Sequence, residues 1–287
     1  EYTPQEDLRK SLKLLNRQYQ QSIKLKTMMN NNLISLLDLT FPGINKLFTS
    51  PSRESDGHEK WVDFVLEFPH CDMISKLTIK SFTRKHMKWC SNNSYYFTES
   101  SCEKIYAFAK ECVSSVSSDE AIVFSVVQAA KMLVSATENC HAIQTEMNRV
   151  ASKLPEYDTV MNMYGVGKAV GPQIMAEIGD PRRFHSRKAI TAYFGYDSEN
   201  NDSGQKTTRS NPMTKKGSGV LRRTLFIIMQ VLLKTKPQDN PVYDFLIKKQ
   251  SEGKHYYSYM NAAANKFLRI YYAKVKEVLH TTETPLT

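Results

Sequence analysis

The sequence predicts a mainly α-helical protein, with long helices in an antiparallel or intermolecular coiled coil and a C-terminal helical domain with few short strands. Two long segments repeat apolar residues at alternating spacings of four and three, which places them on one helix face. Glycine and proline separate the remaining helical segments. Strand patterns are rare, and residues 190–194 are the best short candidate.

The first long helix is expected over residues 4–40. Phe41-Pro42-Gly43 follows it, and proline cannot continue a helix while glycine tolerates the exit. Polar residues interrupt its stripe at two positions, so it is not a clean zipper. The stripe consists of Leu8, Leu12, Leu15, Tyr19, Ser22, Lys26, Met29, Leu33 and Leu36.

A second long helix is expected over about 119–153, after shorter helices near 58–67, 81–90 and 101–116. Its stripe keeps the four-three spacing without a break, which favours a seam against residues 8–39 or against another protomer. An ordinary helical bundle core is the alternative. The stripe consists of Ile122, Val126, Ala129, Leu133, Ala136, Cys140, Ile143, Met147, Val150 and Leu154.

These patterns divide the chain into three parts. Residues 1–45 form the first long helix, 46–153 a helical linker that ends in the second long helix, and 154–287 a C-terminal domain. Within the last part we expect one or two helices over 242–280 and disorder from Thr281.

Composition limits the classes of protein. Apolar residues are 41% and charged residues 24%, ordinary values for a globular chain. The five cysteines include no Cys-x-x-Cys pair, which indicates reduced thiols and a cytoplasmic protein without a metal site in this chain. No signal peptide or uncharged apolar run of membrane-spanning length is present, so we expect no membrane partner. The net charge of +10 favours a polyanion.

Residues 157–180 have the pattern of a helix-hairpin-helix. Gly165 and Gly167 permit a tight turn whose backbone amides can approach a phosphate, and Lys168 adds positive charge. Such a hairpin grips a nucleic-acid backbone without reading its sequence. A plain corner between two helices explains the spacing equally well.

Residues 182–223 concentrate most of the positive charge. Ten basic residues stand against three acidic ones, a net charge of +7, which favours a phosphate-facing surface over a solvated face. The candidate nucleic-acid contacts in this window are Arg182, Arg183, Lys206, Arg209, Lys215, Lys216, Arg222 and Arg223.

A polar loop within that window contains Ser203-Gly204. A reachable hydroxyl beside several cations is the combination that phosphoryl transfer needs, because cations stabilise charge on the phosphate oxygens. By itself, a Ser-Gly pair in a loop is more typical of an ordinary turn. His185 is a candidate base for Ser203, although a lone histidine in a basic loop is commonly a surface residue.

Residues 154–235 resemble the C-terminal domain of the insertion-sequence one-ten family of RuvC-like transposases, a group that includes Piv-type DNA invertases. One departure is Lys215-Lys216-Gly217-Ser218, where the family usually has Lys-x-Gly-Asn. The matching segments are Leu154-Pro155, Gly165-Val166-Gly167, Ala176-Glu177-Ile178-Gly179-Asp180, Arg183-Phe184, Ala192-Tyr193-Phe194-Gly195, Ser203-Gly204, Lys216-Gly217 and Leu221-Arg222-Arg223.

The resemblance implies a function and a larger architecture. It implies that Ser203 attacks a DNA phosphodiester, that a structured guide RNA takes part, and that the protein works as a homodimer or tetramer. It also implies a RuvC-like domain with four carboxylates that bind divalent metal, Mg²⁺, and we expect that domain upstream of Glu1. This chain alone is then expected to bind nucleic acid without recombining it. The alternatives are a non-catalytic nucleic-acid-binding module and the remnant of a degraded mobile element.

Overall fold

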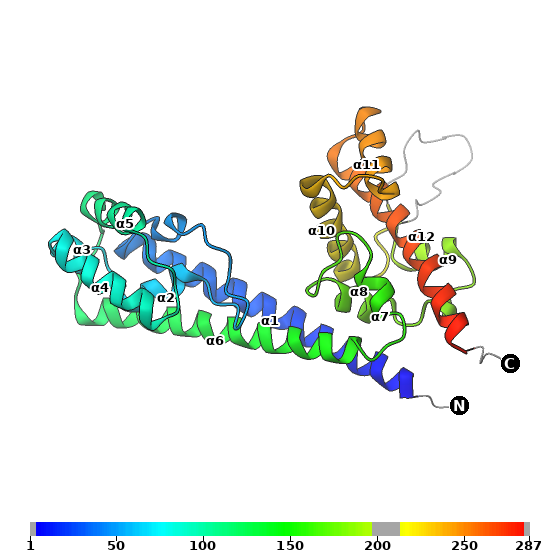
Figure 1. Cartoon of the computed structure of the whole chain (residues 1–287), viewed down its shortest axis with the longest axis horizontal. Helices are drawn as coiled ribbons and strands as arrows, with labels where there is room; N and C mark the ends of the chain where they lie inside the picture. The colour runs from blue at the N-terminus through cyan, green and yellow to red at the C-terminus, as the bar shows by residue number, and fades with distance from the viewer. Residues whose placement is uncertain (1–3, 197–212, 284–287) are drawn as a thin grey trace. The chain divides into compact units, whose positions relative to one another are not determined.

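The computed structural model describes residues 4–196 and 213–283, and in these ranges the chain is mainly helical, with no strand. Figure 1 shows the helices in chain order. The mainly α prediction is confirmed. The chain divides into two compact units, which are described separately: unit 1 is Glu1–Arg17 with Gln144–Thr287, and unit 2 is Gln18–Ile143.

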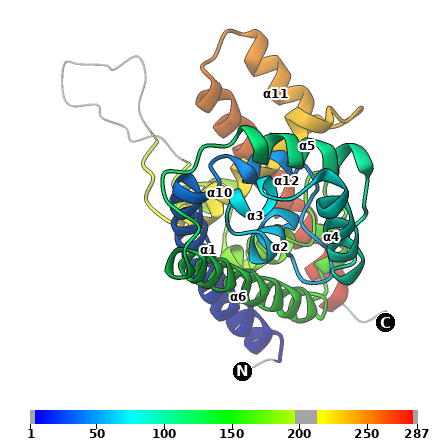
Figure 2. The same ribbon diagram turned by 90° about the vertical axis from the view of Figure 1, so that its left-hand side faces the viewer.

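Two long helices contribute to both units. Helix α1 spans Pro4–Thr40 and α6 spans Glu120–Ala151, close to the predicted bounds. The α1 helix stops before Gly43, whose φ of 81° is the left-handed conformation that glycine adopts without steric cost. In unit 2, Figures 1 and 2 show α1 and α6 side by side and running in opposite directions.

The predicted stripe of α6 is buried inside the chain over most of its length. Of its ten positions, only Ile122 and Ile143 are partly exposed. In unit 2, Val126, Ala129 and Leu133 of this stripe share one core with Leu33 and Leu37 of α1. Within unit 2 this part of the stripe therefore packs inside the chain, which fits both a seam against α1 and an ordinary helical bundle core.

Shorter helices complete unit 2. An aromatic cluster lies at its centre, where the rings of Phe64 and Trp89 meet edge to face at 5.4 Å and Phe82 stacks on His86 at 5.6 Å. Burial of aromatic rings dominates core energetics, so this cluster anchors the unit. The helices are η1 Ile44–Leu47, α2 Lys60–Glu67, α3 Asp72–Ser75, α4 Ile79–Asn92 and α5 Glu99–Glu111.

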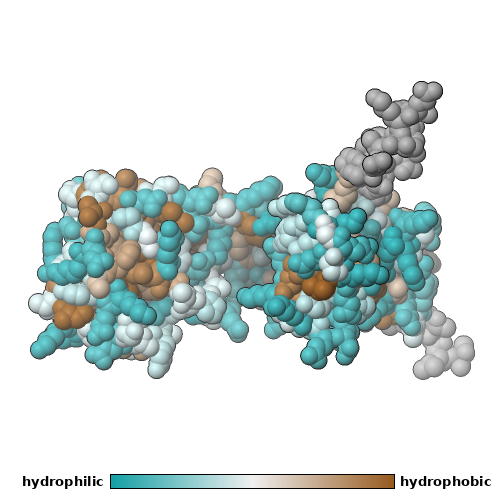
Figure 3. Space-filling view, turned by 90° about the horizontal axis from the view of Figure 1, so that it is seen from above, coloured by the Kyte–Doolittle hydropathy of each residue, from teal (hydrophilic) through white to brown (hydrophobic). Residues whose placement is uncertain are grey.

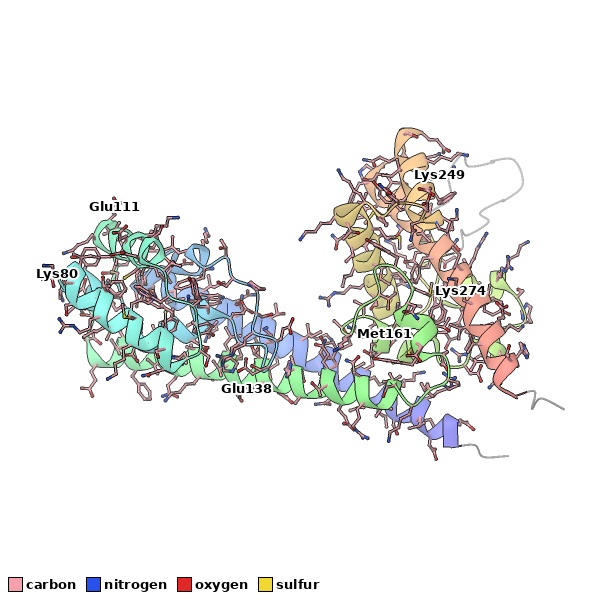
Figure 4. All side chains as sticks on the ribbon, in the orientation of Figure 1. Lys80, Glu111, Glu138, Met161, Lys249 and Lys274 are labelled. Carbon is pink, nitrogen blue, oxygen red and sulfur yellow. The ribbon has the colours of Figure 1, made fainter. Side chains whose placement is uncertain are left out.

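All five cysteines are free thiols, as predicted. Four of them are buried and Cys112 is half-buried. His58 links two acidic residues of unit 2: its Nε2 lies 3.1 Å from Oε1 of Glu138, which Figure 4 labels, and its Nδ1 lies 3.1 Å from Asp63 Oδ1. On the face of unit 2 that Figure 3 shows, apolar side chains lie among the polar ones.

By length and composition, α6 could cross a membrane. A single helix of this kind is weak support for a membrane span, because core helices of water-soluble proteins meet the same criterion. In this chain, 33% of the apolar window is buried. The absence of a membrane partner stays a prediction.

Unit 1 is built around α12, which packs against α7, α9, α10 and α11, while α10 also packs against α8. Leu225 and Ile228 of α10 and Phe267 and Tyr271 of α12 are fully buried at its centre. The helices are α7 Tyr157–Met161, α8 Gly171–Ile178, η2 Pro181–Arg183, α9 Arg187–Tyr193, α10 Gly219–Thr235, α11 Pro241–Ser251 and α12 Tyr256–Glu283.

Two local predictions for this unit were wrong. Residues 190–194 are not a strand: α9 covers all but the last of them, because Ser186 Oγ accepts a hydrogen bond from Ala189 N and caps the helix. At the C-terminus, α12 continues past Thr281 to Glu283.

Candidate nucleic-acid interface

The predicted nucleophile and two of the predicted cations lie outside the described residues. These are Ser203, Lys206 and Arg209, all within residues 197–212. The structure instead describes the two ends of this segment and the surface around them.

Two glycines hold the ends of the segment together. Gly195 has a φ of +72°, and a Cβ added there would lie 2.7 Å from Lys216 N and 2.8 Å from Lys215 C. Gly217 has a φ of +113° and faces the backbone of Tyr193 and Phe194 in the same way. Lys215 N also donates a hydrogen bond to Gly195 O at 3.3 Å. We call residues 193–196 and 213–217 the loop stem.

Cations surround the loop stem. Lys215, Lys216 and Arg223 are exposed. Arg222 is half-buried, and its Nη1 donates a hydrogen bond to Phe194 O at 3.0 Å, which ties α10 to residues 193–196 of the stem. Lys215 and Lys216 thus lie in the loop stem and Arg222 contacts it, while Arg223 is the next residue of α10.

Ser218 fixes the start of α10 beside the stem. Its Oγ accepts a hydrogen bond from Leu221 N at 3.1 Å and donates one to Glu177 Oε2. Glu177 also accepts a hydrogen bond from Asn16 Nδ2 at 2.7 Å. Serine and asparagine are both favoured N-caps, so the departure from Lys-x-Gly-Asn at Ser218 keeps the cap. In the sequence, Glu177 is part of the motif Ala176-Glu177-Ile178-Gly179-Asp180, and no local pattern predicts its contact with Ser218.

The predicted hairpin has a different geometry from the one its spacing suggested. Helix α8 begins at Gly171, four residues after Gly167, and Gly171 N donates to Gly167 O at 2.8 Å. Gly171 is buried against Met161 (Figure 4), whose Sδ would lie 2.5 Å from an added Cβ. The amide at the start of α8 is therefore not available to a phosphate.

Other groups of this turn are accessible. Gly167 and Lys168 are exposed, and a Cβ at Gly167 would meet nothing within 4 Å. Gly165 instead serves packing: its φ is +83°, and an added Cβ would lie 3.0 Å from Ile228 Cγ2 of α10. A role in the fold thus explains Gly165, whereas Gly167 and Lys168 remain candidates for contact with a phosphate.

The two arginines of η2 differ. Arg182 Nη2 lies 2.7 Å from Asp180 Oδ2, so its charge is largely compensated. Burial acts to raise the pKa of the Asp180 carboxyl, but hydrogen bonds from Arg182 outweigh it and hold the pKa below its ordinary value.

Arg183 is exposed, and its guanidinium lies 4.6 Å from the Phe184 ring centroid and 4.7 Å from that of Tyr193. These contacts orient its charge without neutralising it. His185, the candidate base, is also exposed, but its relation to Ser203 lies outside the described residues.

Arg9 and Glu156 form a buried ion pair in unit 1. Glu156 is 0% exposed and Arg9 is 9% exposed, with Arg9 Nη2 3.1 Å from Glu156 Oε2 and Nη1 also bonded to the same carboxylate. Arg9 Nη1 donates a further hydrogen bond to Gly179 O at 3.4 Å. The pair joins the start of α1 to the segment that leads into Asp180.

The described residues do not fit a magnesium site. His70, Cys71 and Asp72 form a group whose ligand atoms lie close together. However, His70 Nδ1 accepts a hydrogen bond from Asp72 N and Nε2 donates to Val116 O, both at 3.1 Å, so neither ring nitrogen is open. Mg²⁺ prefers oxygen ligands, and this group offers one carboxylate.

The described fold and surface define an all-helical unit with a loop held at its stem among cations. Residues 157–244 match the model of a family described as the Transposase IS116/IS110/IS902 family. No curated protein matches the chain. The matched region, which runs from α7 through the loop stem to the start of α11, is similar to transposases of this family, in agreement with the predicted resemblance.

Proposed function

We propose that this chain acts in DNA transposition, with unit 1 binding DNA and Ser203 supplying the nucleophile for strand cleavage and rejoining. The observation that carries the proposal is the family match over residues 157–244, which includes the whole Ser203 segment and its stem. The stem supports it physically, because two glycine contacts fix where the segment begins and ends.

In the proposed reaction, the hydroxyl oxygen of Ser203 attacks a DNA phosphorus atom and forms an O–P bond. The bond from phosphorus to one sugar oxygen breaks, and that oxygen takes up a proton. Attack by a sugar hydroxyl on the serine-linked phosphate then rejoins a strand and frees Ser203. Lys206, Arg209, Lys215, Lys216, Arg222 and Arg223 would stabilise the charge on the phosphate oxygens.

Contacts with the DNA backbone would extend beyond the reacting phosphate. Gly167 and Lys168 are exposed in the turn before α8, and Arg183 is exposed on η2. Gly165 would act through packing against α10, and Arg182 would add little because Asp180 offsets its charge. These assignments refine the predicted contact set of the turn and η2.

The wider assembly follows from the resemblance. We propose a structured guide RNA as a second nucleic-acid partner, a RuvC-like domain that binds Mg²⁺ through four carboxylates, a homodimer or tetramer, and a cytoplasmic location. Because the apolar stripe of α6 is buried within the chain, self-association would use other surfaces. Sedimentation velocity at micromolar protein would reveal the oligomer.

Salt dependence of DNA binding tests the proposed interface. If six to ten phosphates are contacted, the affinity for duplex DNA falls roughly 10³- to 10⁵-fold between about 50 and 200 mM salt. Arg223→Gln should lower the slope of log K against log salt by about 1, whereas Lys80→Gln on α4 of unit 2 (Figure 4) should leave it unchanged. A flat salt response in the parent chain, or equal effects of both substitutions, would contradict the interface.

A further inference from the structure

A cluster of aromatic side chains lies where α10 meets the start of α12. Tyr257 stacks on Phe226 at 5.8 Å between centroids with an interplanar angle of 25°. Tyr256 meets Phe226 edge to face at 5.9 Å, and His255 lies 5.8 Å from Tyr257. We call Phe226, His255, Tyr256 and Tyr257 the α10–α12 aromatic cluster.

The cluster is on the surface and is not part of the core. Tyr257 is 60% exposed and Tyr256 is 37% exposed, while Phe226 is half-buried beneath them. Phe226 thus supports the Tyr257 ring, most of which remains accessible. Exposed apolar surface of this kind in a globular unit marks a site of interaction.

The two helices that carry the cluster are rich in cations, and this favours a polyanion as their partner. Residues 213–236, which contain α10, include six basic residues and no acidic one. Residues 253–276, which contain most of α12, include five basic residues and no acidic one. Lys274 on α12 is one of these cations (Figure 4). The nearest acidic side chain in sequence, Glu252, lies 2.7 Å from Lys249 and is offset by it.

Two cations are placed to act together with the rings. Arg223 is exposed and precedes Phe226 by three residues, which puts both on one face of α10. Lys254 is exposed and precedes the cluster directly in the chain. Single-stranded nucleic acid is bound by this combination, in which aromatic rings stack on bases and neighbouring cations contact the backbone.

We propose that the α10–α12 aromatic cluster stacks an unpaired base of a DNA strand, with Tyr257 as the ring in contact and Arg223 and Lys254 on the adjacent phosphates. The proposal rests on the proposed function in that the strand is the DNA on which the chain acts. Inside a paired duplex, both faces of each base are covered by its stacked neighbours, so the cluster would discriminate in favour of unpaired DNA. Helix α10, which carries Phe226, begins directly after the loop stem.

The test uses the full chain and three labelled probes of one sequence: single-stranded DNA carrying 2-aminopurine, the same DNA as a blunt duplex, and the matching RNA strand. Tyr257→Ala should weaken binding of the single-stranded DNA about 5- to 150-fold, the range expected for one lost base–aromatic stack, and should relieve 2-aminopurine quenching. Tyr257→Phe should retain both, and Tyr96→Ala, at an 85% exposed tyrosine of unit 2, should change neither.

Duplex affinity should be the same in all variants. The inference is overturned if Tyr257→Ala leaves single-stranded binding and quenching unchanged while the parent chain binds DNA, an outcome that spares the proposed function. Equal weakening on duplex and single strand would indicate a general role in the fold, and weakening on RNA alone would assign the cluster to RNA; both contradict the proposal. A parent chain that binds none of the probes would refute the proposed function and the inference together.

Discussion

The substitution Gly195→Ala should destabilise unit 1 through two separable costs. Gly195 has a φ of +72°, and the left-handed region costs a non-glycine residue about 1 to 2 kcal/mol. The added methyl would also lie within 2.8 Å of backbone atoms of Lys215 and Lys216, which cannot rotate away. Overpacking of this kind costs roughly 1 to 3 kcal/mol, so the free energy of unfolding should fall by about 2 to 5 kcal/mol.

Gly253→Ala is the matched control. Gly253 has a φ of +73°, but a Cβ there would meet nothing within 4 Å. The backbone cost and the effect on the unfolded chain are therefore shared, and the difference between the variants, about 1 to 3 kcal/mol, isolates the contact across the stem.

Urea unfolding followed by far-UV circular dichroism measures the difference. Both tryptophans, Trp61 and Trp89, lie in unit 2, so their fluorescence reports that unit alone. Gly195→Ala should lower the dichroism midpoint and leave the fluorescence transition unchanged if the units unfold independently. Equal losses in Gly195→Ala and Gly253→Ala would refute the close crossing of the stem.

Three further substitutions test single interactions within the two units: a buried ion pair, a buried histidine and a helix cap. Arg9→Met leaves the buried Glu156 carboxylate without its partner and should lower the free energy of unfolding in urea by about 3 to 5 kcal/mol. Adding Glu156→Leu to this variant should restore most of the loss, and no recovery would contradict the ion pair. Burial lowers the pKa of His86 to about 4, with a smaller contribution from Lys60. Because the unfolded chain therefore binds the proton more readily, the free energy of unfolding of unit 2 should fall by about 3 kcal/mol as the pH drops from about 6.5 to 4. Trp89 fluorescence in urea, measured at each pH, would report this loss of stability. His86→Leu should remove the loss, and a pH dependence that is the same in His86→Leu as in the parent chain would contradict the pKa shift of His86. Ser218→Ala removes the cap of α10 and should cost about 1 kcal/mol by dichroism, and a neutral result would argue against the cap.

The long helices were the most predictable part of the fold. Unbroken four-three spacing located α6, and its stripe is buried as expected. In α1, the pattern placed Leu15 on the seam, but Asn16 is the fully buried residue. Its partner, Glu177, is distant in sequence, so no local period could reveal it.

Predictions from local propensity were wrong or incomplete where a helix cap or a contact between distant residues determines the structure. Apolar and aromatic residues suggested a strand at 190–194, but the Ser186 cap begins a helix there. The close approach of Gly195 to Gly217 depends on two segments that are not neighbours in the chain, and the sequence marks it only by two glycines. By contrast, the exposure of the cations Lys215, Lys216 and Arg223 follows from their charge alone.

The most direct test of the central claim is a search for a covalent protein–DNA adduct in the complete recombination reaction, with the RuvC-like domain, guide RNA and a nicked target DNA present. Trypsin should release residues 189–206, which contain both Ser198 and Ser203, so mass spectrometry locates the adduct on this peptide. The account predicts an adduct that Ser203→Ala abolishes and Ser198→Ala spares. An adduct that survives Ser203→Ala, or no adduct in the parent protein while strands are joined, would contradict it.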